Sequence, residues 1–311
     1  MAKHALCYLI DDNYLFPTLV SASQAAAQVD RATTDIIIVV LGEPSAAIEV
    51  CAPICSALGV TLQRSPRAAI DDMHPTYARL FIDRLIAPIY ERVVYIDADT
   101  QIAGDLRDLF MRPIPAGAFL AARDPLALAI DRPTKSAARD RAYFASIGLS
   151  PKRMRRYFNA GVLAFARDDW RAVASPALDL VRTRALRFKD QDALNLVEDG
   201  RALPLSLKWN FPIFLINAGL ERVLAPHVYH FMSNPRPWHG AFQPWGARWH
   251  APYLDMLAYY PQLGPLASKM ALPVRLRYML QQRAKAALER VTWRTRGVHS
   301  AVDAFERDAE I

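Results

Sequence analysis

The strongest constraint on the fold is an alternation of apolar runs and helical segments through about the first hundred residues. Strands are predicted at 4–10, 35–41, near 60–62 and at 92–96, and helices at 17–29, 44–58 and 76–87. The run DIIIVVL at 35–41 is rich in β-branched residues, which is typical of a strand buried on both faces of a parallel sheet. This order favours right-handed βαβ units, so we expect an α/β fold with a mainly parallel sheet flanked by helices.

Two acidic groups follow strands in this pattern. Asp11-Asp12-Asn13 comes directly after the first strand, and Asp97-Ala98-Asp99 follows the strand that ends at Ile96. Ligands of open α/β sheets bind just beyond the carboxyl ends of the strands. We therefore expect the two acidic groups to meet in one site.

Asp97 and Asp99 are candidate metal ligands. They are two residues apart, so an extended backbone would point both side chains to one face. Converging carboxylates repel each other unless a proton or a cation lies between them. Mn²⁺ and Mg²⁺ accept oxygen ligands and can also hold a diphosphate. Asp-x-Asp also occurs in solvated loops, so the pair alone leaves both readings open.

The chain changes character towards its C-terminus. It is expected to be helical from about Pro252, and we expect a catalytic α/β domain over 1–250 with a helical, basic extension over 251–311. Between Lys269 and Arg296, eight Lys or Arg residues stand against one acidic residue, Glu289.

One face of the helix predicted in this basic extension is apolar. It carries Leu276, Leu280, Ala284, Ala287 and Val291, with Tyr278 and Trp293 as candidate interfacial anchors. Basic helices with an apolar stripe lie on anionic membranes. The extension is therefore a candidate peripheral membrane contact.

Composition narrows the partners and the compartment. The net charge of +7 favours anionic partners such as nucleotide phosphates or acidic lipids. No base-reading motif indicates nucleic acid. No apolar run approaches the length of a membrane span or a secretory signal, so we expect a cytoplasmic protein, with the inner face of the cytoplasmic membrane as a candidate peripheral site.

Six motifs occur in a fixed order along the chain. They are Asp11-Asp12-Asn13-Tyr14, Thr76-Tyr77-Ala78-Arg79-Leu80, Val94-Tyr95-Ile96-Asp97-Ala98-Asp99, Tyr157-Phe158-Asn159-Ala160-Gly161-Val162, Asp190-Gln191-Asp192-Ala193-Leu194-Asn195, and His230 through Pro237-Trp238-His239. The series resembles the family 8 glycosyltransferases, the group that includes bacterial lipooligosaccharide and lipopolysaccharide galactosyl- or glucosyltransferases and glycogenin. The resemblance implies a GT-A (Rossmann-like) fold. It also implies retaining, metal-dependent transfer of galactose or glucose from a UDP-sugar to a glycan or lipid-linked acceptor, such as lipopolysaccharide or another surface polysaccharide.

The same resemblance assigns residue roles. Asp97, Asp99 and His230 would ligate the metal, most often Mn²⁺, with Mg²⁺ as the other candidate. The donor-binding residues would be Asp11, Asn13 and Tyr14 at the uridine, Arg79 at the phosphates or the sugar, Arg236 at the phosphates, and Ala160 near the sugar. The transferred sugar would also meet Asn159, Asp190 and Gln191, the three candidate catalytic residues. Gln191 would lie nearest the reacting carbon, and since an amide is a poor nucleophile, same-face substitution is favoured over a covalent intermediate.

Three positions depart from the family pattern. Arg236 stands where the family usually has Lys, Ser233 where it has Gly, and Leu9 where a smaller residue is common.

Two other functions stay open at this point: a catalytically degenerate nucleotide-sugar-binding protein and a sugar-phosphate nucleotidyltransferase. The nucleotidyltransferase would typically open with a glycine-rich basic loop, which Asp11-Asp12-Asn13 does not resemble. A basic cluster at 152–156 is a further candidate contact for an anionic acceptor.

Overall fold

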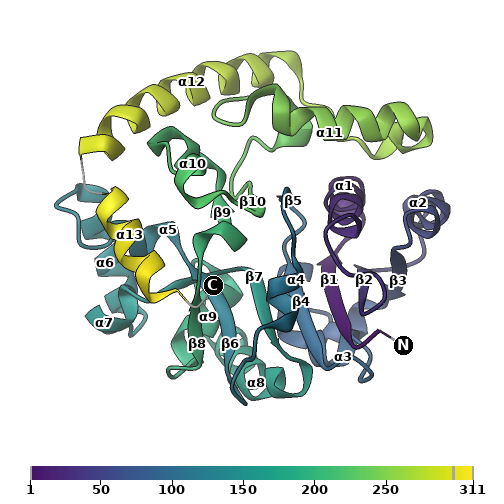
Figure 1. Cartoon of the computed structure of the whole chain (residues 1–311), viewed down its shortest axis with the longest axis horizontal. Coiled ribbons are helices and arrows are strands. Elements are labelled where there is room, and N and C mark those ends of the chain that lie inside the picture. Colours follow the sequence, from purple (N-terminus) through teal and green to yellow (C-terminus); the bar gives the residue numbers. More distant parts are fainter. Residues whose placement is uncertain (1, 296–297, 310–311) are drawn as a thin grey trace.

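A seven-stranded sheet crosses the middle of the molecule (Figure 1). The computed structural model describes residues 2–295 and 298–309, except for the side chains of 293–295. The spatial order of the sheet is β3-β2-β1-β4-β7-β6-β8. The strands are β1 His4–Ile10, β2 Thr34–Leu41, β3 Thr61–Ser65, β4 Arg92–Ile96, β6 Phe119–Arg123, β7 Phe158–Ala166 and β8 Ala202–Leu205.

The sheet is mainly parallel. Strand β1 pairs in parallel with β2 and β4, and β2 with β3. Only β7 runs against its neighbours, β4 and β6, while β8 is again parallel to β6. The prediction of a mainly parallel α/β sheet is therefore confirmed, and the strands predicted in the first hundred residues lie where the apolar runs placed them.

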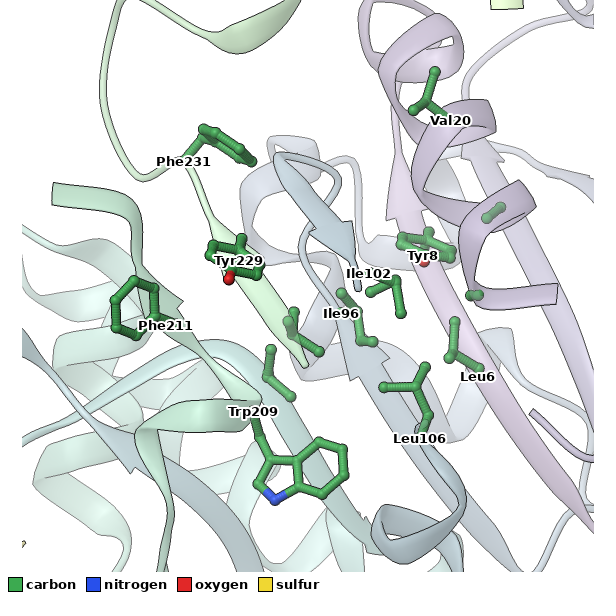
Figure 2. Packing of buried hydrophobic residues seen from close by; sticks show 14 of the residues in the cluster. Leu6, Tyr8, Val20, Ile96, Ile102, Leu106, Trp209, Phe211, Tyr229 and Phe231 are labelled. Carbon is green, nitrogen blue, oxygen red and sulfur yellow. The ribbon is translucent and has the colours of Figure 1, made fainter. Parts of the chain in front are cut away.

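Helices cover both faces of the sheet because alternate strand residues point to opposite sides. On one face, Leu6 and Tyr8 of β1 pack with Val20 of helix α1, as Figure 2 shows. On the other face, Cys7 and Val93 belong to a second cluster with Trp170. The helices involved are α1 Leu15–Ala26, α2 Ala46–Ala57 and α4 Arg107–Met111 on the first face, and α8 Trp170–Thr183 and α9 Lys189–Val197 on the second.

The helices predicted at 17–29 and 44–58 are confirmed, but the one predicted at 76–87 is wrong in type. The segment is a 3₁₀ helix, η3 Pro75–Phe81, followed by a single α-turn, α3 Ile82–Leu85. Pro75 sits in the first turn, where its missing N–H costs nothing, and His74 caps the start. At the other end, Pro88 disfavours a helical backbone at the preceding residue, and the chain is already extended at Ile86.

A small second sheet stands beside the large one. Its order is β5-β10-β9, with β5 Thr100–Ile102, β9 Phe211–Pro212 and β10 Val228–His230. In Figure 2, Phe211 lies on β9, Tyr229 on β10 and Phe231 just beyond β10, and all three belong to the main apolar core. Strands of two or three residues carry too little periodicity to be predicted, so this sheet was missed.

Two groups of helices complete the described chain. A short group beyond β6 has its own apolar cluster, and comprises α5 Pro125–Ala129, α6 Lys135–Ser146 and α7 Pro151–Met154. The C-terminal group comprises α11 Gly246–Tyr259, α12 Leu272–Thr295 and α13 Val298–Asp308. In Figure 1, α12 arches over the molecule and α13 lies back against it, with Val298, Val302 and Phe305 buried in the main core. The division at residue 250 stays a prediction, although α11 runs through it. No described helix is both long and apolar enough to cross a bilayer.

Candidate active site

A cleft of about 570 Å³ opens at the carboxyl ends of the central strands. Its walls come from the segments after β1, β4 and β6, from η3 and α9, and from the chain after β10. The volume is in the range of small-molecule sites. The predicted meeting of the two acidic groups at this edge is borne out, since Asp11 and Asp97 both line the cleft.

Asp97, Asp99 and His230 form a compact group within the cleft. Their ligand atoms all lie within 4.8 Å of one another. His230 Nε2 is 3.2 Å from Asp99 Oδ1 and 3.7 Å from Asp97 Oδ2. The small sheet produces this proximity, because His230 pairs with Thr100, the residue that follows Asp99. Two carboxylates and an imidazole nitrogen fit Mn²⁺ or Mg²⁺, and the imidazole favours Mn²⁺.

A buried amide fixes the orientation of this histidine. His230 Nδ1 is 2.8 Å from Asn210 Oδ1, an atom that can only accept a hydrogen bond. Asn210 is oriented in turn, because its Nδ2 donates to Asn159 Oδ1 at 2.9 Å. A His230 that ligates a metal ion through Nε2 would therefore carry its proton on Nδ1 and donate it to Asn210.

Gly161 makes room for the imidazole. A Cβ atom built on Gly161 would lie 2.3 Å from His230 Cε1 and 2.8 Å from its Nδ1. The Gly161 carbonyl also accepts the N–H of Asp97 at 2.8 Å. A glycine is thus required at position 161 of β7, because any larger side chain would keep His230 away from Asp97.

Two arginines neutralise the carboxylates of the group. Arg79 Nη2 donates to Asp97 Oδ1 at 3.0 Å, and Arg236 Nη1 contacts Asp99 Oδ2. Burial would raise the pKa of Asp99, but Arg236 and His230 outweigh it and hold the pKa below its usual range. Arg79 also pairs with Asp190, with Nε 2.7 Å from Oδ2, although the contact is not aligned as a hydrogen bond. Burial, only partly offset by Arg79, raises the pKa of Asp190 to about 6.

A network of side-chain amides lies on the β6 side of the Asp97-Asp99-His230 group, called the metal group below. Asn159 Nδ2 donates to Gln191 Oε1 at 3.1 Å, and both amides donate to Asp124 Oδ2, at 3.0 and 3.1 Å. Asp124 is buried and lines the cleft, and burial raises its pKa. Asp124 was not predicted, although a carboxylate directly after the strand Phe119–Arg123 is the same signal that indicated Asp97.

The predicted site residues divide into two sets. Those that line the cleft are Asp11, Tyr14, Arg79, Asp97, Asp99, Asn159, Gln191, His230 and Arg236, together with the departures Leu9 and Ser233. Three others do not line it. Asn13 is exposed on the short 3₁₀ turn Asp12–Tyr14, Asp190 is buried against Arg79, and Ala160 is buried with its N–H donated to Gln191 Oε1.

The basic cluster at 152–156 lies away from the cleft. Arg153 donates to the carbonyl oxygens of Asn195 and Leu196, and Arg155 donates to Asp131 Oδ2 at 2.7 Å. None of the four basic side chains is among the cleft-lining residues. The cluster therefore has, at least in part, a structural role at the start of β7.

The mainly parallel sheet, with an Asp-Asp-His group that could hold a metal ion at its carboxyl edge, defines a GT-A type α/β protein. The model of glycosyl transferase family 8 matches residues 5–241, and the chain belongs to that family.

Curated relatives agree with this family. The chain is 25% identical over 181 residues to the glycosyltransferase GlyE of Streptococcus pneumoniae, which covers 53% of this chain and 37% of the relative. It is 23% identical over 177 residues to a lipopolysaccharide 1,2-glucosyltransferase of Escherichia coli, covering 52% and 48% of the two chains. The chain thus spans less than half the length of these relatives.

Solved structures show the same fold. The bifunctional glycosyltransferase WbbM superposes with a TM-score of 0.65 at 20% identity, over 85% of this chain and 51% of that one. The galactosyltransferase LgtC, solved with donor and acceptor sugar analogues, superposes with a TM-score of 0.61 at 21% identity, over 81% and 95%.

Proposed function

We propose that this protein is a retaining, metal-dependent glycosyltransferase that transfers galactose or glucose from a UDP-sugar to a glycan acceptor. The observation that supports this most strongly is the Asp97-Asp99-His230 group, with its histidine held by Asn210, at the edge of a cleft of ligand size. Mn²⁺ is the proposed ion, and when bound it supplies positive charge that stabilises the departing diphosphate.

Different side chains around the Asp97-Asp99-His230 group are proposed to bind different parts of the donor. Asp11, Asn13 and Tyr14, at the end of β1, are proposed to hold the uridine. Arg79 and Arg236 are proposed to bind the diphosphate once their carboxylate partners hold a cation. A guanidinium suits this role because it binds phosphate oxygens in a bidentate fashion.

The amide network is proposed to hold the sugar and to explain retention. The bond from the anomeric carbon to the diphosphate breaks, a bond to the acceptor oxygen forms on the same face, and the hydroxyl proton passes to the diphosphate. Gln191 lines this part of the cleft and is a poor nucleophile. Asp190 is turned towards Arg79, so we assign it to positioning rather than to attack. Asn159, Ala160 and Asp124 complete the sugar pocket in this proposal.

A lipopolysaccharide or another surface polysaccharide is the proposed acceptor. The Escherichia coli relative, named as a lipopolysaccharide 1,2-glucosyltransferase, supports this acceptor class.

The function is tested by measuring UDP release from a panel of UDP-sugars without acceptor, with Mn²⁺ and then with EDTA. We expect slow, Mn²⁺-dependent hydrolysis of UDP-galactose or UDP-glucose that is lost in Asp97→Asn. UDP binding without hydrolysis of any donor, even when glycan acceptors are added, would favour the degenerate binding protein instead. Family membership leaves the nucleotidyltransferase without support.

We also propose that α12 rests on the anionic inner face of the cytoplasmic membrane. Leu276, Leu280 and Val291 point outward, with exposures of 47%, 65% and 65%, whereas Gln282 and Ala286 on the opposite face are buried. Tyr278 is half-buried, in edge contact with Phe242, so it is not an outward anchor, and the side chain of Trp293 lies outside the described part.

The membrane proposal predicts sedimentation with phosphatidylglycerol vesicles at low salt. Leu276→Ser combined with Leu280→Ser should reduce the bound fraction several-fold, because apolar burial drives the insertion. Equal binding of the double variant, or no binding of the wild type, would contradict it.

A further inference from the structure

One end of the cleft has no part in the proposed donor site. The uridine residues follow β1, and β4 separates β1 from β7 and β6 in the sheet. Leu126 follows β6, Phe188 immediately precedes α9, and Phe214 lies on the 3₁₀ segment η6 Ile213–Ala218. All three line the cleft. Leu126 follows β6 and α9 packs on β7, so Leu126 and Phe188 lie across β4 from the uridine residues. With the donor in place, this end is the part that remains for an acceptor.

Two aromatic rings line this end, and each has a cation near it. Arg187 Cζ lies 4.7 Å from the centre of the Phe188 ring, and Lys285 Nζ of α12 lies 5.7 Å from the centre of the Phe214 ring. Both rings are half-buried. An aromatic wall buries the apolar face of a sugar, and a cation beside it binds negative charge.

Arg187 differs from the other two cleft-lining arginines. Arg79 and Arg236 are occupied by the carboxylates of the metal group. Arg187 has one described ion pair, to Asp140, and its 3.6 Å separation is too long for a hydrogen bond. Its side chain is 56% exposed. Among the described cleft-lining residues, it is therefore the guanidinium whose donors are most open to a ligand.

The Arg187 guanidinium is also held in place. It lies over the rings of both Phe188 and Tyr143, and the backbone N–H of Arg187 donates to Tyr143 Oη at 2.8 Å. A guanidinium that is already ordered loses less entropy when it binds an anion. Asp124, the acid that lines the cleft nearest this end, does not compete for it, since it accepts from Asn159 and Gln191.

We propose that Arg187 selects an acceptor that carries a negative charge close to the hydroxyl that receives the sugar. The charged group is a phosphate or a carboxylate on the acceptor sugar, and Phe188 and Phe214 hold the ring itself. This rests on the proposed transferase function, and it deepens that function by naming the acceptor class.

The test compares three probes that differ in charge: glucose 6-phosphate, glucuronate and glucose. Binding to the complex of the full chain with UDP and Mg²⁺ is followed by saturation-transfer NMR. We expect at least one charged sugar to bind five-fold or more tightly than glucose. A preference for glucose 6-phosphate alone identifies a phosphate group, and a preference for glucuronate identifies a carboxylate.

Substitutions then locate the preference. Arg187→Gln should reduce the ratio of charged to neutral affinity to about one, and Arg187→Lys should keep part of it, because the charge remains without the planar fork. Arg171→Gln, an exposed arginine of α8 outside the cleft, should keep the wild-type ratio. Melting curves of each variant show whether it folds.

The possible outcomes distinguish a failure of charge selection by Arg187 from a failure of the proposed transferase function. Failure of UDP to bind the wild type contradicts the transferase itself. Normal UDP binding with equal affinity for all three sugars, or with no sugar binding at all, contradicts charge selection alone. A preference that survives in Arg187→Gln contradicts the assignment to Arg187.

Discussion

At the scale of single residues, Gly161 is, among the described glycines, the one with the least room for a side chain. A methyl group there would overlap the ring of His230, and the neighbour is a buried side chain held by Asn210. Substitutions that displace a metal ligand through its supporting contacts typically cost 10–100-fold in metal affinity.

Gly161→Ala should therefore weaken Mn²⁺ binding by at least about ten-fold, as measured by the electron paramagnetic resonance signal of free Mn²⁺. Gly264→Ala is the matched control, because no atom lies within 4 Å of a Cβ at that position. Unchanged Mn²⁺ affinity in a folded Gly161→Ala protein would show that His230 is not a ligand.

Asp190 predicts a pH dependence of stability. Its pKa is about 6 in the folded chain, against an ordinary value of 3.8, because it is buried. The folded state therefore holds this proton more tightly than the unfolded state, and the resulting stability is present below about pH 4 and is lost as the pH rises through 6. Across this window, the stability of the wild type relative to Asp190→Asn should fall by at most about 3 kcal/mol. Melting in EDTA at a series of pH values measures this, and a constant difference between the two proteins would contradict the raised pKa.

Functional residues that lie in short motifs could be predicted from the sequence. The residues that hold them in position by hydrogen bonds could not. Asp97, Asp99 and His230 belong to recognisable local patterns, and the structure brings them together. Asn210 has no such pattern around it. Its position depends on a tertiary contact with Asn159, and a single sequence does not show that contact.

At the scale of elements, α13 is the segment whose packing was least expected. It lies in the predicted extension, yet Val302 and Phe305 are buried in the main core. Glu306 ties it to the segment after β8, because its carboxylate accepts from Ser206 Oγ at 2.5 Å and from the backbone N–H of Leu207 at 2.9 Å. Amphipathicity indicates that a helix has a buried face, but not which surface covers it.

Glu306→Ala should lower the free energy of unfolding by about 2 kcal/mol, because it removes two charge-assisted hydrogen bonds and leaves a backbone N–H without its acceptor. The shift in the urea midpoint measures this loss. Asp303→Ala removes the same charge from an exposed position of the same helix and should change stability by less than about 0.5 kcal/mol. Equal effects of the two substitutions would mean that α13 contributes through charge alone.

The strands that were predicted correctly, and the helix that was predicted with the wrong type, show which features of secondary structure follow from sequence periodicity. The run at 35–41 lies in a strand that is buried on both faces, so its composition alone identified it. The segment 76–87 has the apolar residues of a helix, but Pro75 and Pro88 bound it closely and it folds mainly as a 3₁₀ helix. The small sheet could not be predicted from the sequence, because its short strands form only by pairing with distant segments.

At the scale of the whole molecule, the site exists only where two sheets meet. The large sheet supplies the backbone next to Asp97, and the small sheet carries His230 to it. The fold class and the edge at which ligands bind followed from the order of strands and helices. The depth of the cleft, and the presence of Arg187 and Phe214 in its wall, required the tertiary structure.

In the proposed function, one metal ion, held by Asp97, Asp99 and His230, joins the nucleotide diphosphate to the protein. Calorimetric titration of UDP with Mn²⁺ and with EDTA tests this link, because coupled ligands must strengthen each other's binding reciprocally. We predict that UDP binds at least about ten-fold more tightly with Mn²⁺, a coupling of the size typical between linked sites, and that His230→Ala loses this difference while remaining folded. UDP binding of equal strength in EDTA, or an undiminished effect of Mn²⁺ in His230→Ala, would contradict the account.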